Sequence, residues 1–219
     1  MLTLGYIVAA IAAYLLGSIP TGFLVAKARG VDIRTVGSGN IGATNVFRAL
    51  GKRAGVFVLL VDVLKGYVAC RLIGDWAARL FDGVGLMTTH EYFLIIAGFC
   101  AVLGHNFTCW LYFKGGKGIA TSAGVLLALF PQALLVVLVI WAVVFALGRY
   151  VSLASITAAF WLPVFVSLFG YSGQRVVVAI VMAALAIYQH KTNIQRLMAG
   201  TENRFGDKKP DPAAALPPQ

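Results

Sequence analysis

Long apolar runs without a charged residue constrain this chain more than any other feature of its sequence. No residue between Lys117 and Arg149 is charged, and none from Tyr150 to Gln174. Over the whole chain 60% of the residues are hydrophobic and 12% are charged, whereas soluble domains are about 25% charged. These proportions exclude a soluble globular domain and a largely disordered chain. They indicate a polytopic membrane protein.

The apolar runs are continuous and do not alternate with period 2, which disfavours a transmembrane β-barrel. At about 20 residues for each spanning helix, we expect an all-α integral membrane protein with about seven transmembrane helices. Only Pro131 separates two of the runs, and it either starts a new helix or kinks one long helix, so that six spans is the alternative. The expected helices cover residues 3–25, 54–74, 92–110, 117–130, 132–148, 151–169 and 174–190, with a polar break at 74–91.

Basic residues are distributed unequally between the expected loops, and this asymmetry predicts the orientation. Fourteen Lys and Arg residues fall in loop 27–53, near 111–118, at 148–151 and after residue 190, whereas three fall in the other loops. Cytoplasmic loops carry the excess of positive charge. We therefore expect the N-terminus outside and the C-terminus in the cytoplasm. The net charge of +10 follows from the same asymmetry and needs no nucleic-acid partner.

The chain reads as one polytopic domain over residues 1–206, followed by a Pro-rich tail at 207–219 that we expect to be disordered. The apolar start has no basic segment before it, so we interpret it as the first span and not as a signal peptide. Cys70, Cys100 and Cys109 have no metal-type spacing, and we expect free thiols.

Three polar segments fall on the expected cytoplasmic side. The first, residues 37–45, has three glycines, two asparagines and two hydroxyl residues. Such a loop lets its backbone N–H groups approach an anion, and Arg48 follows about one helical turn later. An ordinary membrane loop with turn residues is the simpler alternative for this segment taken alone.

The second segment contains His105 and Asn106 and then the run from Lys114 to Gly118. Two lysines around a Gly-Gly pair can neutralise a phosphate, although membrane anchoring would also explain them. The run does not match a P-loop, because Gly118 follows Lys117 where Ser or Thr is required and no strand is expected before it. For His105, a structural hydrogen-bonding role is the alternative to a role in catalysis.

The third segment starts at His190 and includes Glu202. If the last helix continues past residue 190, His190, Asn193 and Leu197 share one helix face. An interfacial helix end whose long side chains reach toward water is the alternative. Asp62 and Lys65 are a separate case, since charges inside an apolar run mark either function or a structural pair.

Together these motifs closely resemble the bacterial acyl-phosphate-dependent glycerol-3-phosphate acyltransferases. The matching residues are Ser38 to Asn45, Gly104 to Phe107, Lys114 to Gly118, and His190, Asn193 and Gly200 to Glu202. The resemblance covers the whole chain in length, span number and motif order. It implies transfer of a fatty acyl group from acyl phosphate to the 1-hydroxyl of glycerol 3-phosphate. The products are lysophosphatidic acid and phosphate, in the first step of phospholipid synthesis.

The resemblance also implies the site. The expected catalytic residues are His190, Ser38 and Asn193. The expected substrate-binding residues are Gly39, Asn40, Thr44, Asn45, Arg48, His105, Lys114, Gly115, Gly116, Lys117 and Glu202. We expect the backbones of Gly39–Asn40 and Gly115–Gly116 to stabilise developing charge, and His190 to deprotonate or orient the acceptor hydroxyl. No cofactor and no metal ion is expected.

The expected partners are glycerol 3-phosphate, a long-chain acyl phosphate, membrane lipid and the enzyme that makes the acyl phosphate. The expected location is the bacterial inner membrane, with the site facing the cytoplasm. Acyltransferases that use acyl-CoA typically carry His-x4-Asp, but the fifth residues after the three histidines are Ile95, Trp110 and Gln195. A carrier for a phosphorylated metabolite is the competing function. The absence of an internal repeat and the position of the motifs at one interface disfavour it.

Overall fold

The computed structural model describes residues 1–83 and 87–206, and in this part of the chain every regular element is helical. The predicted disorder of residues 207–219 lies outside the described residues. The α-helices are α1 (Leu2–Ser18), α2 (Thr21–Lys27), α3 (Ala43–Leu50), α4 (Lys52–Val68), α5 (Asp75–Phe81), α6 (Met87–Asn106), α7 (Ile119–Leu129), α8 (Pro131–Gly148), α9 (Val151–Leu168), α10 (Gly173–Gln189) and α11 (Lys191–Met198).

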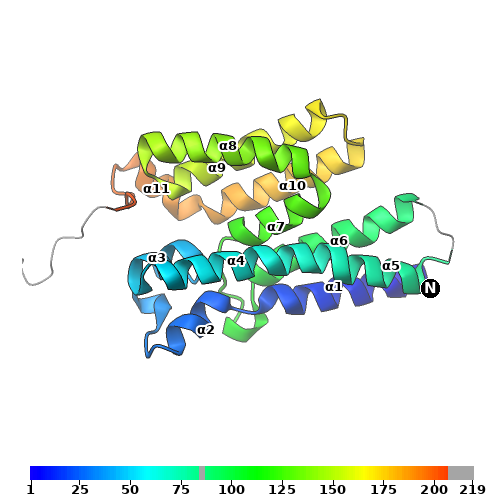
Figure 1. Ribbon diagram of the computed structural model, residues 1–219, viewed down its shortest axis with the longest axis horizontal. Helices are drawn as coiled ribbons and strands as arrows, with labels where there is room; N and C mark the ends of the chain where they lie inside the picture. Colours follow the sequence, from blue (N-terminus) through cyan, green and yellow to red (C-terminus); the bar gives the residue numbers. More distant parts are fainter. Residues whose placement is uncertain (84–86, 207–219) are drawn as a thin grey trace, which may run out of the picture.

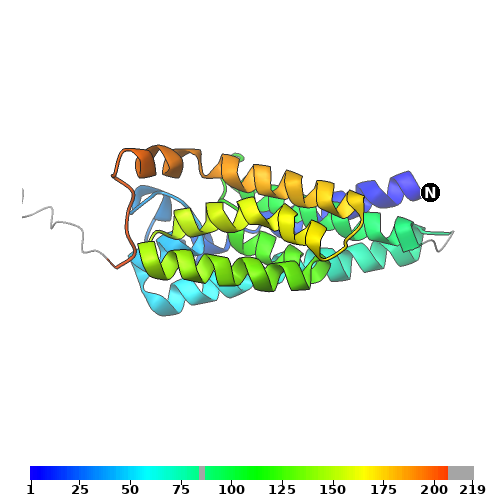
Figure 2. The same cartoon turned by 90° about the horizontal axis from the view of Figure 1, so that it is seen from above.

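The helices form two groups that run along one common direction (Figures 1 and 2). In one group α1 packs on α6 and α4 lies beside them, while in the other α9 packs on both α8 and α10. The short helix α7 lies between the groups and packs on α4. The N-terminus lies at one end of the molecule, whereas α2, α3, α11 and residues 199–206 lie at the other (Figure 1).

Glycines let neighbouring helices pack unusually close together. A Cβ atom on Gly17 of α1 would lie 2.1 Å from the carbonyl oxygen of Ala101 in α6. One on Gly124 of α7 would lie 1.9 Å from the carbonyl oxygen of Val63 in α4. No side chain fits at either position. Small residues at such contacts are how helices pack in lipid, where burial of apolar surface between helices gives little driving force.

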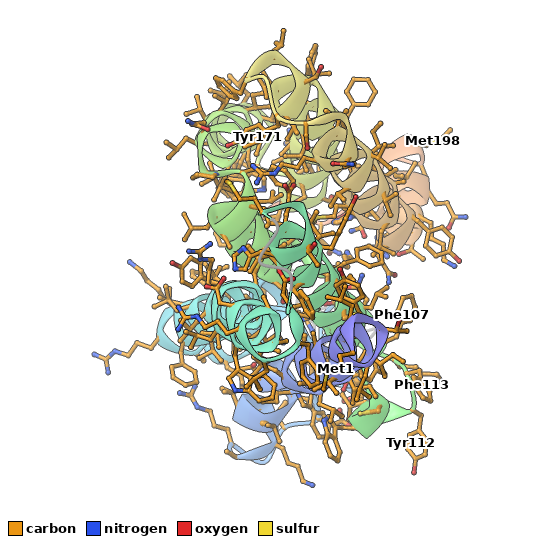
Figure 3. The ribbon with its side chains drawn as sticks, turned by 90° about the vertical axis from the view of Figure 1, so that its right-hand side faces the viewer. Met1, Phe107, Tyr112, Phe113, Tyr171 and Met198 are labelled. Atoms are coloured by element: carbon orange, nitrogen blue, oxygen red, sulfur yellow. The ribbon has the colours of Figure 1, made fainter. Side chains whose placement is uncertain are left out.

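Large apolar side chains cover the outside of the bundle. On α8, Leu135 is 65% exposed and Val139 63%. Figure 3 shows Phe107, Tyr112 and Phe113 projecting away from the helices, and Tyr112 is 87% exposed. An apolar exterior of this extent is unfavourable in water and favourable in lipid. The fold is that of an all-helical integral membrane protein, as predicted.

By length and composition, four helical segments of the described chain can each cross a membrane: Leu2–Lys27, Thr89–Leu111, Pro131–Gly148 and Val151–Leu168. The bent pair of α10 and α11 makes a fifth candidate. Pro131 starts α8 as its first residue, so it divides the run into two helices, and α7 is an apolar helix of only 11 residues. Seven crossings and the orientation of the termini stay predictions.

Two predicted boundaries are wrong. The expected break over residues 74–91 is mostly helical, because the helix of α4 continues through a π-helical turn, Ala69–Gly74, into α5. Ala77 and Ala78 are buried against Phe93, so packing of small residues outweighs the charges that suggested a loop. The first expected helix, 3–25, is broken before α2, because Pro20 has no N–H to continue the helical hydrogen bonds.

A buried ion pair fills this break. Lys65 and Asp62 of α4 are 2.8 Å apart and their side chains are 4% and 2% exposed. The Lys65 ammonium also donates to the carbonyl oxygen of Ile19 (3.0 Å), and Thr21 donates to Asp62 (3.1 Å). The structural alternative for Asp62 and Lys65 is therefore confirmed, since the pair supplies hydrogen bonds to a backbone that Pro20 interrupts.

We expect Lys65→Met to lower the free energy of unfolding by about 3–5 kcal/mol, because it leaves the Asp62 carboxylate buried and unpaired. The double variant Asp62→Asn, Lys65→Met removes both charges and should recover much of this loss. Thermal unfolding of the purified protein in detergent measures both. A single variant as stable as the unsubstituted protein would contradict the bracing role of the pair.

Candidate active site

The first and third polar segments lie at the end of the bundle opposite the N-terminus (Figure 1), and Lys117 of the second segment reaches the third through its bond to Asn193. Loop 36–42 and α3 come from the first helix group, and the bend between α10 and α11 comes from the second. Loop 112–118 links α6 to α7. The condition set for the third segment, a last helix that continues straight past residue 190, is not met. The axis bends by 58° at His190, so that the shared face of His190, Asn193 and Leu197 does not form on one straight helix.

Asn45 organises the first loop. Its side-chain amide donates to the carbonyl oxygens of Val36 (2.9 Å), Asn40 (2.9 Å) and Ile33 (3.2 Å), and its oxygen accepts from the N–H of Ser38 (3.0 Å). Asn45 makes all of these bonds and is only 2% exposed. We expected Asn45 to bind substrate, but here its side chain shapes the loop.

The same loop presents Ser38 to solvent, while Gly39, Asn40 and Thr44 are partly buried. The N–H of Gly39 donates to the carbonyl oxygen of Val36 (3.0 Å), and the Asn40 side chain accepts from the N–H of Gly42 (2.8 Å). The expectation that the Gly39 N–H faces developing charge is therefore wrong for this conformation, because that N–H closes the turn.

The glycine loop folds back on the end of α6. The N–H groups of Gly115 and Gly116 donate to the carbonyl oxygens of Asn106 and His105, both at 3.0 Å. Neither N–H is free to stabilise charge on a substrate, contrary to our expectation. A Cβ on Gly116 would lie 2.1 Å from His105 Nε2, so these glycines let the loop pass close over the histidine.

His105 is thus part of the scaffold beneath the loop. It is 4% exposed, and its Nδ1 lies 3.7 Å from the Asp62 carboxylate. The histidine lies between the ion pair of α4 and the loop that carries Lys117. Its Nδ1 has no hydrogen-bond partner among the described residues, so the choice between a structural role and a role in catalysis stays a prediction. The side chain of Lys114, in the same loop, is exposed.

Lys117 begins a chain of polar contacts that links the second and third segments. Its ammonium donates to the side-chain oxygen of Asn193, and the Asn193 amide donates to Glu202 (2.7 Å). Arg196 donates to the other oxygen of Glu202 (2.7 Å), and Ser152 of α9 donates to the first (2.8 Å). Asn193 is 4% exposed, so the amide is held in one orientation between a cation and an anion.

Arg48 joins this group from the first segment. Its guanidinium donates to the carbonyl oxygen of Asn203 (3.3 Å) and interacts electrostatically with Glu202, Arg196 and Lys117. The described structure therefore gathers three cations around one carboxylate. Such a group has excess positive charge and suits a phosphate.

The electrostatic environment changes the titration of two of these groups. Burial lowers the pKa of Lys117 to about 8, although the attraction of Glu202 opposes the shift. Burial also disfavours ionisation of Glu202, but hydrogen bonds from Arg196, Asn193 and Ser152 outweigh it and lower the pKa of the carboxyl below its ordinary value. Glu202 is therefore an anion at neutral pH, and Lys117 gains or loses its charge near physiological pH.

His190 ends α10 and is 3% exposed. Its Nδ1 lies 2.8 Å from the carbonyl oxygen of Ala186. Because a carbonyl can only accept, the proton of the neutral ring is on Nδ1 and the lone pair is on Nε2. His190 can therefore accept a proton or a hydrogen bond at Nε2.

An apolar cavity of about 80 Å³ lies between α7, α8, α9 and α10. Ile119, two residues after Lys117, and Ala186, the hydrogen-bond partner of His190, both line it. Leu126, Leu134, Leu162 and Met182 line it as well. The cavity connects the level of the polar group with the apolar core of the bundle.

Sequence reasoning missed several residues of this end. Ser152 and Arg196 hold Glu202, yet Ser152 lies in an apolar run and Arg196 was counted only as a topological charge. Arg149 and Phe205 were likewise unassigned, and they bond to each other across 56 positions of the sequence. Glu202 itself was predicted as a site residue, but no sequence signal pointed to the residues that hold it.

Comparisons with known proteins show the family of this chain. The family model for glycerol-3-phosphate acyltransferase matches residues 7–200. A glycerol-3-phosphate acyltransferase of Geotalea daltonii is 49% identical over 199 residues, which cover 91% of this chain and 97% of that protein. One of Aquifex aeolicus is 46% identical over 193 residues, covering 88% of this chain and 95% of that protein.

Two solved structures are also similar. Both are crystal structures of PlsY (YgiH), an integral membrane glycerol 3-phosphate acyltransferase. The glycerol 3-phosphate form has a TM-score of 0.81 and 45% identity, covering 92% of this chain and 96% of that chain. The lysophosphatidic acid form has a TM-score of 0.79 and 44% identity, covering 92% and 95%. This chain belongs to the glycerol-3-phosphate acyltransferase family and is an all-helical integral membrane member of it.

Proposed function

We propose that this protein transfers a fatty acyl group from acyl phosphate to the 1-hydroxyl of glycerol 3-phosphate, forming lysophosphatidic acid and phosphate. The observation that carries the proposal is the cation group of Arg48, Lys117 and Arg196, which three separate segments bring around Glu202. Both substrates carry phosphate. The two similar crystal structures of PlsY (YgiH) are its glycerol 3-phosphate form and its lysophosphatidic acid form.

Four side chains serve the phosphate groups. Arg48 and Lys117 neutralise phosphate oxygens, the exposed hydroxyl of Ser38 donates a hydrogen bond, and Asn193 positions the ammonium of Lys117. Asn193 is oriented by Glu202, to which its amide donates. We assign Glu202 to holding this arrangement, because its two oxygens accept from Ser152, Asn193 and Arg196.

The reaction needs no strong base. The acceptor oxygen attacks the acyl carbon, the bond from that carbon to the phosphate oxygen breaks, and the leaving phosphate takes the hydroxyl proton. The lone pair of His190 Nε2 then orients the hydroxyl by accepting its hydrogen bond. The missing His-x4-Asp pattern supports acyl phosphate over acyl-CoA as the donor.

The apolar cavity between α7 and α10 receives the start of the acyl chain, and the rest extends toward lipid. Small residues line part of the cavity, among them Ala123, Ala158 and Ala186. The positive-inside asymmetry supports a location in the inner membrane with the site facing the cytoplasm. An enzyme that makes acyl phosphate is the implied partner.

Purified protein in detergent should form lysophosphatidic acid and phosphate from glycerol 3-phosphate and palmitoyl phosphate. We expect no product from palmitoyl-CoA in a parallel reaction. Mass spectrometry of the lipid and a phosphate assay measure the two products. Product from palmitoyl-CoA alone would refute the proposed donor, and product from neither would favour a carrier function.

Arg48→Ala and Lys117→Ala should each lower kcat/KM by about 10- to 100-fold, since a hydrogen bond to a charged group contributes about 1.5–3 kcal/mol. His190→Ala should cost less, because the leaving phosphate takes the proton. Steady-state kinetics with both substrates tests this order. If His190→Ala abolishes turnover while substrate binding is retained, the histidine is the base.

The dependence of kcat/KM on pH should follow the protonation of Lys117. Its free-enzyme pKa of about 8 means that the protonated, phosphate-binding form is present below pH 8 and is lost above it. We therefore expect kcat/KM to fall up to tenfold per pH unit on the alkaline side. Lys117→Arg stays charged, so whatever activity it retains should lack this decline. A profile flat to pH 10 would show that the charge of Lys117 is not needed.

A further inference from the structure

Residues 199–206, which we call the strap, run from the end of α11 to the turn between α8 and α9, at the end of the molecule opposite the N-terminus (Figures 1 and 2), and contact α3 of the first helix group there. The strap carries Glu202, which organises Asn193 and Arg196, and Asn203, whose carbonyl oxygen accepts from Arg48. The position of the strap therefore affects groups on both sides of the site.

One end of the strap is fixed to the turn between α8 and α9. The N–H of Phe205 donates to the carbonyl oxygen of Arg149 (2.8 Å). The guanidinium of Arg149 donates twice to the carbonyl oxygen of Phe205, at 2.9 Å and 2.6 Å. Arg149 has φ 60°, a left-handed conformation that is unfavourable for a residue with a side chain. The three hydrogen bonds between Arg149 and Phe205 help to hold Arg149 in this conformation.

The Phe205 ring touches both helix groups. Its centroid lies 5.1 Å from that of Phe47 in α3 and 5.5 Å from that of Phe145 in α8, edge to face. The guanidinium of Arg48 lies 6.0 Å from the same ring. Aromatic contacts of this geometry are attractive and directional.

Few other contacts join α3 to the second helix group. In the described residues α3 packs extensively on α4 and has at most marginal contact with α8 and α9. The distance between Arg48, on α3, and the Lys117–Asn193–Glu202 chain therefore depends on the strap. A phosphate that bridges the two sides is bound only when that distance is correct.

We propose that Phe205 and Arg149 are positioning residues that hold α3 against α8, as a clamp at this end of the molecule, and so set the distance across the phosphate-binding group. The proposal rests on phosphate binding by Arg48 and Lys117 in the proposed function. In this proposal neither Phe205 nor Arg149 contacts substrate. They act through Arg48 and Glu202, and their loss should weaken glycerol 3-phosphate binding more than it changes anything else.

The test compares Phe205→Ala, Phe205→Tyr and the control Arg204→Ala, a neighbour on the strap whose guanidinium lies 5.2 Å from the Tyr150 ring. Calorimetric titration with glycerol 3-phosphate needs no acyl donor, so it tests the clamp even if the proposed donor is wrong. We expect affinity to fall about 10- to 100-fold in Phe205→Ala, in line with the cost of an ångström of misplacement. Phe205→Tyr and Arg204→Ala should bind normally.

Kinetics and stability separate positioning from folding. We expect Phe205→Ala to raise the KM for glycerol 3-phosphate, with the KM for the acyl donor and the unfolding temperature unchanged. Arg149→Lys, which loses the double hydrogen bond, should show the same pattern more weakly. The proposal is overturned if Phe205→Ala binds glycerol 3-phosphate normally, or if its affinity falls only together with its unfolding temperature and Phe205→Tyr does not restore it.

Discussion

The buried ion pair of Asp62 and Lys65 is the interaction on which the rest of the structure depends. A charge in a membrane bundle is costly unless it is paired and hydrogen-bonded, and here each partner has a second task. Lys65 bonds to the carbonyl oxygen of Ile19 at the α1 break, and Asp62 faces His105 beneath the glycine loop. The pair thus joins α1, α4 and α6 at the level where the chain leaves its regular helices. Lys117 extends from the loop that rests on this junction.

The cation group shows why an enzyme of this kind needs two helix groups. Three like charges repel one another, and the Glu202 carboxylate offsets this repulsion by binding Arg196 and, through Asn193, Lys117. The remaining excess of positive charge is available to phosphate. Because Arg48 comes from α3 and Asn193 from α11, packing at one end of the bundle decides whether these charges act together. The proposed clamp at Phe205 is a consequence of that division.

Helix positions were predictable where apolar runs have clear ends. The expected helices at 132–148 and 151–169 match α8 and α9 within one residue, because Pro131 starts the first and Arg149 separates them. The prediction failed where packing overrode composition. At Ala77 and Ala78 a helix continues through a charged stretch of the sequence. At Pro20 and His190 helices end although the surrounding sequence is apolar or has helical periodicity. The predicted anion-binding N–H groups of Gly115 and Gly116 are also engaged, since local spacing does not reveal which carbonyls α6 leaves free.

The sequence by itself determined the class of protein, the approximate helices and the motifs of the family, because hydrophobicity and short motifs are local properties. Only the tertiary structure decided the partners. Arg48 meets the carbonyl of Asn203 across 155 positions, Lys117 meets Asn193 across 76, and Arg149 meets Phe205 across 56. In the sequence, each of these charged side chains had several possible hydrogen-bond acceptors. The choice among them follows from how the helices that carry these residues pack, which depends on contacts that no local pattern encodes.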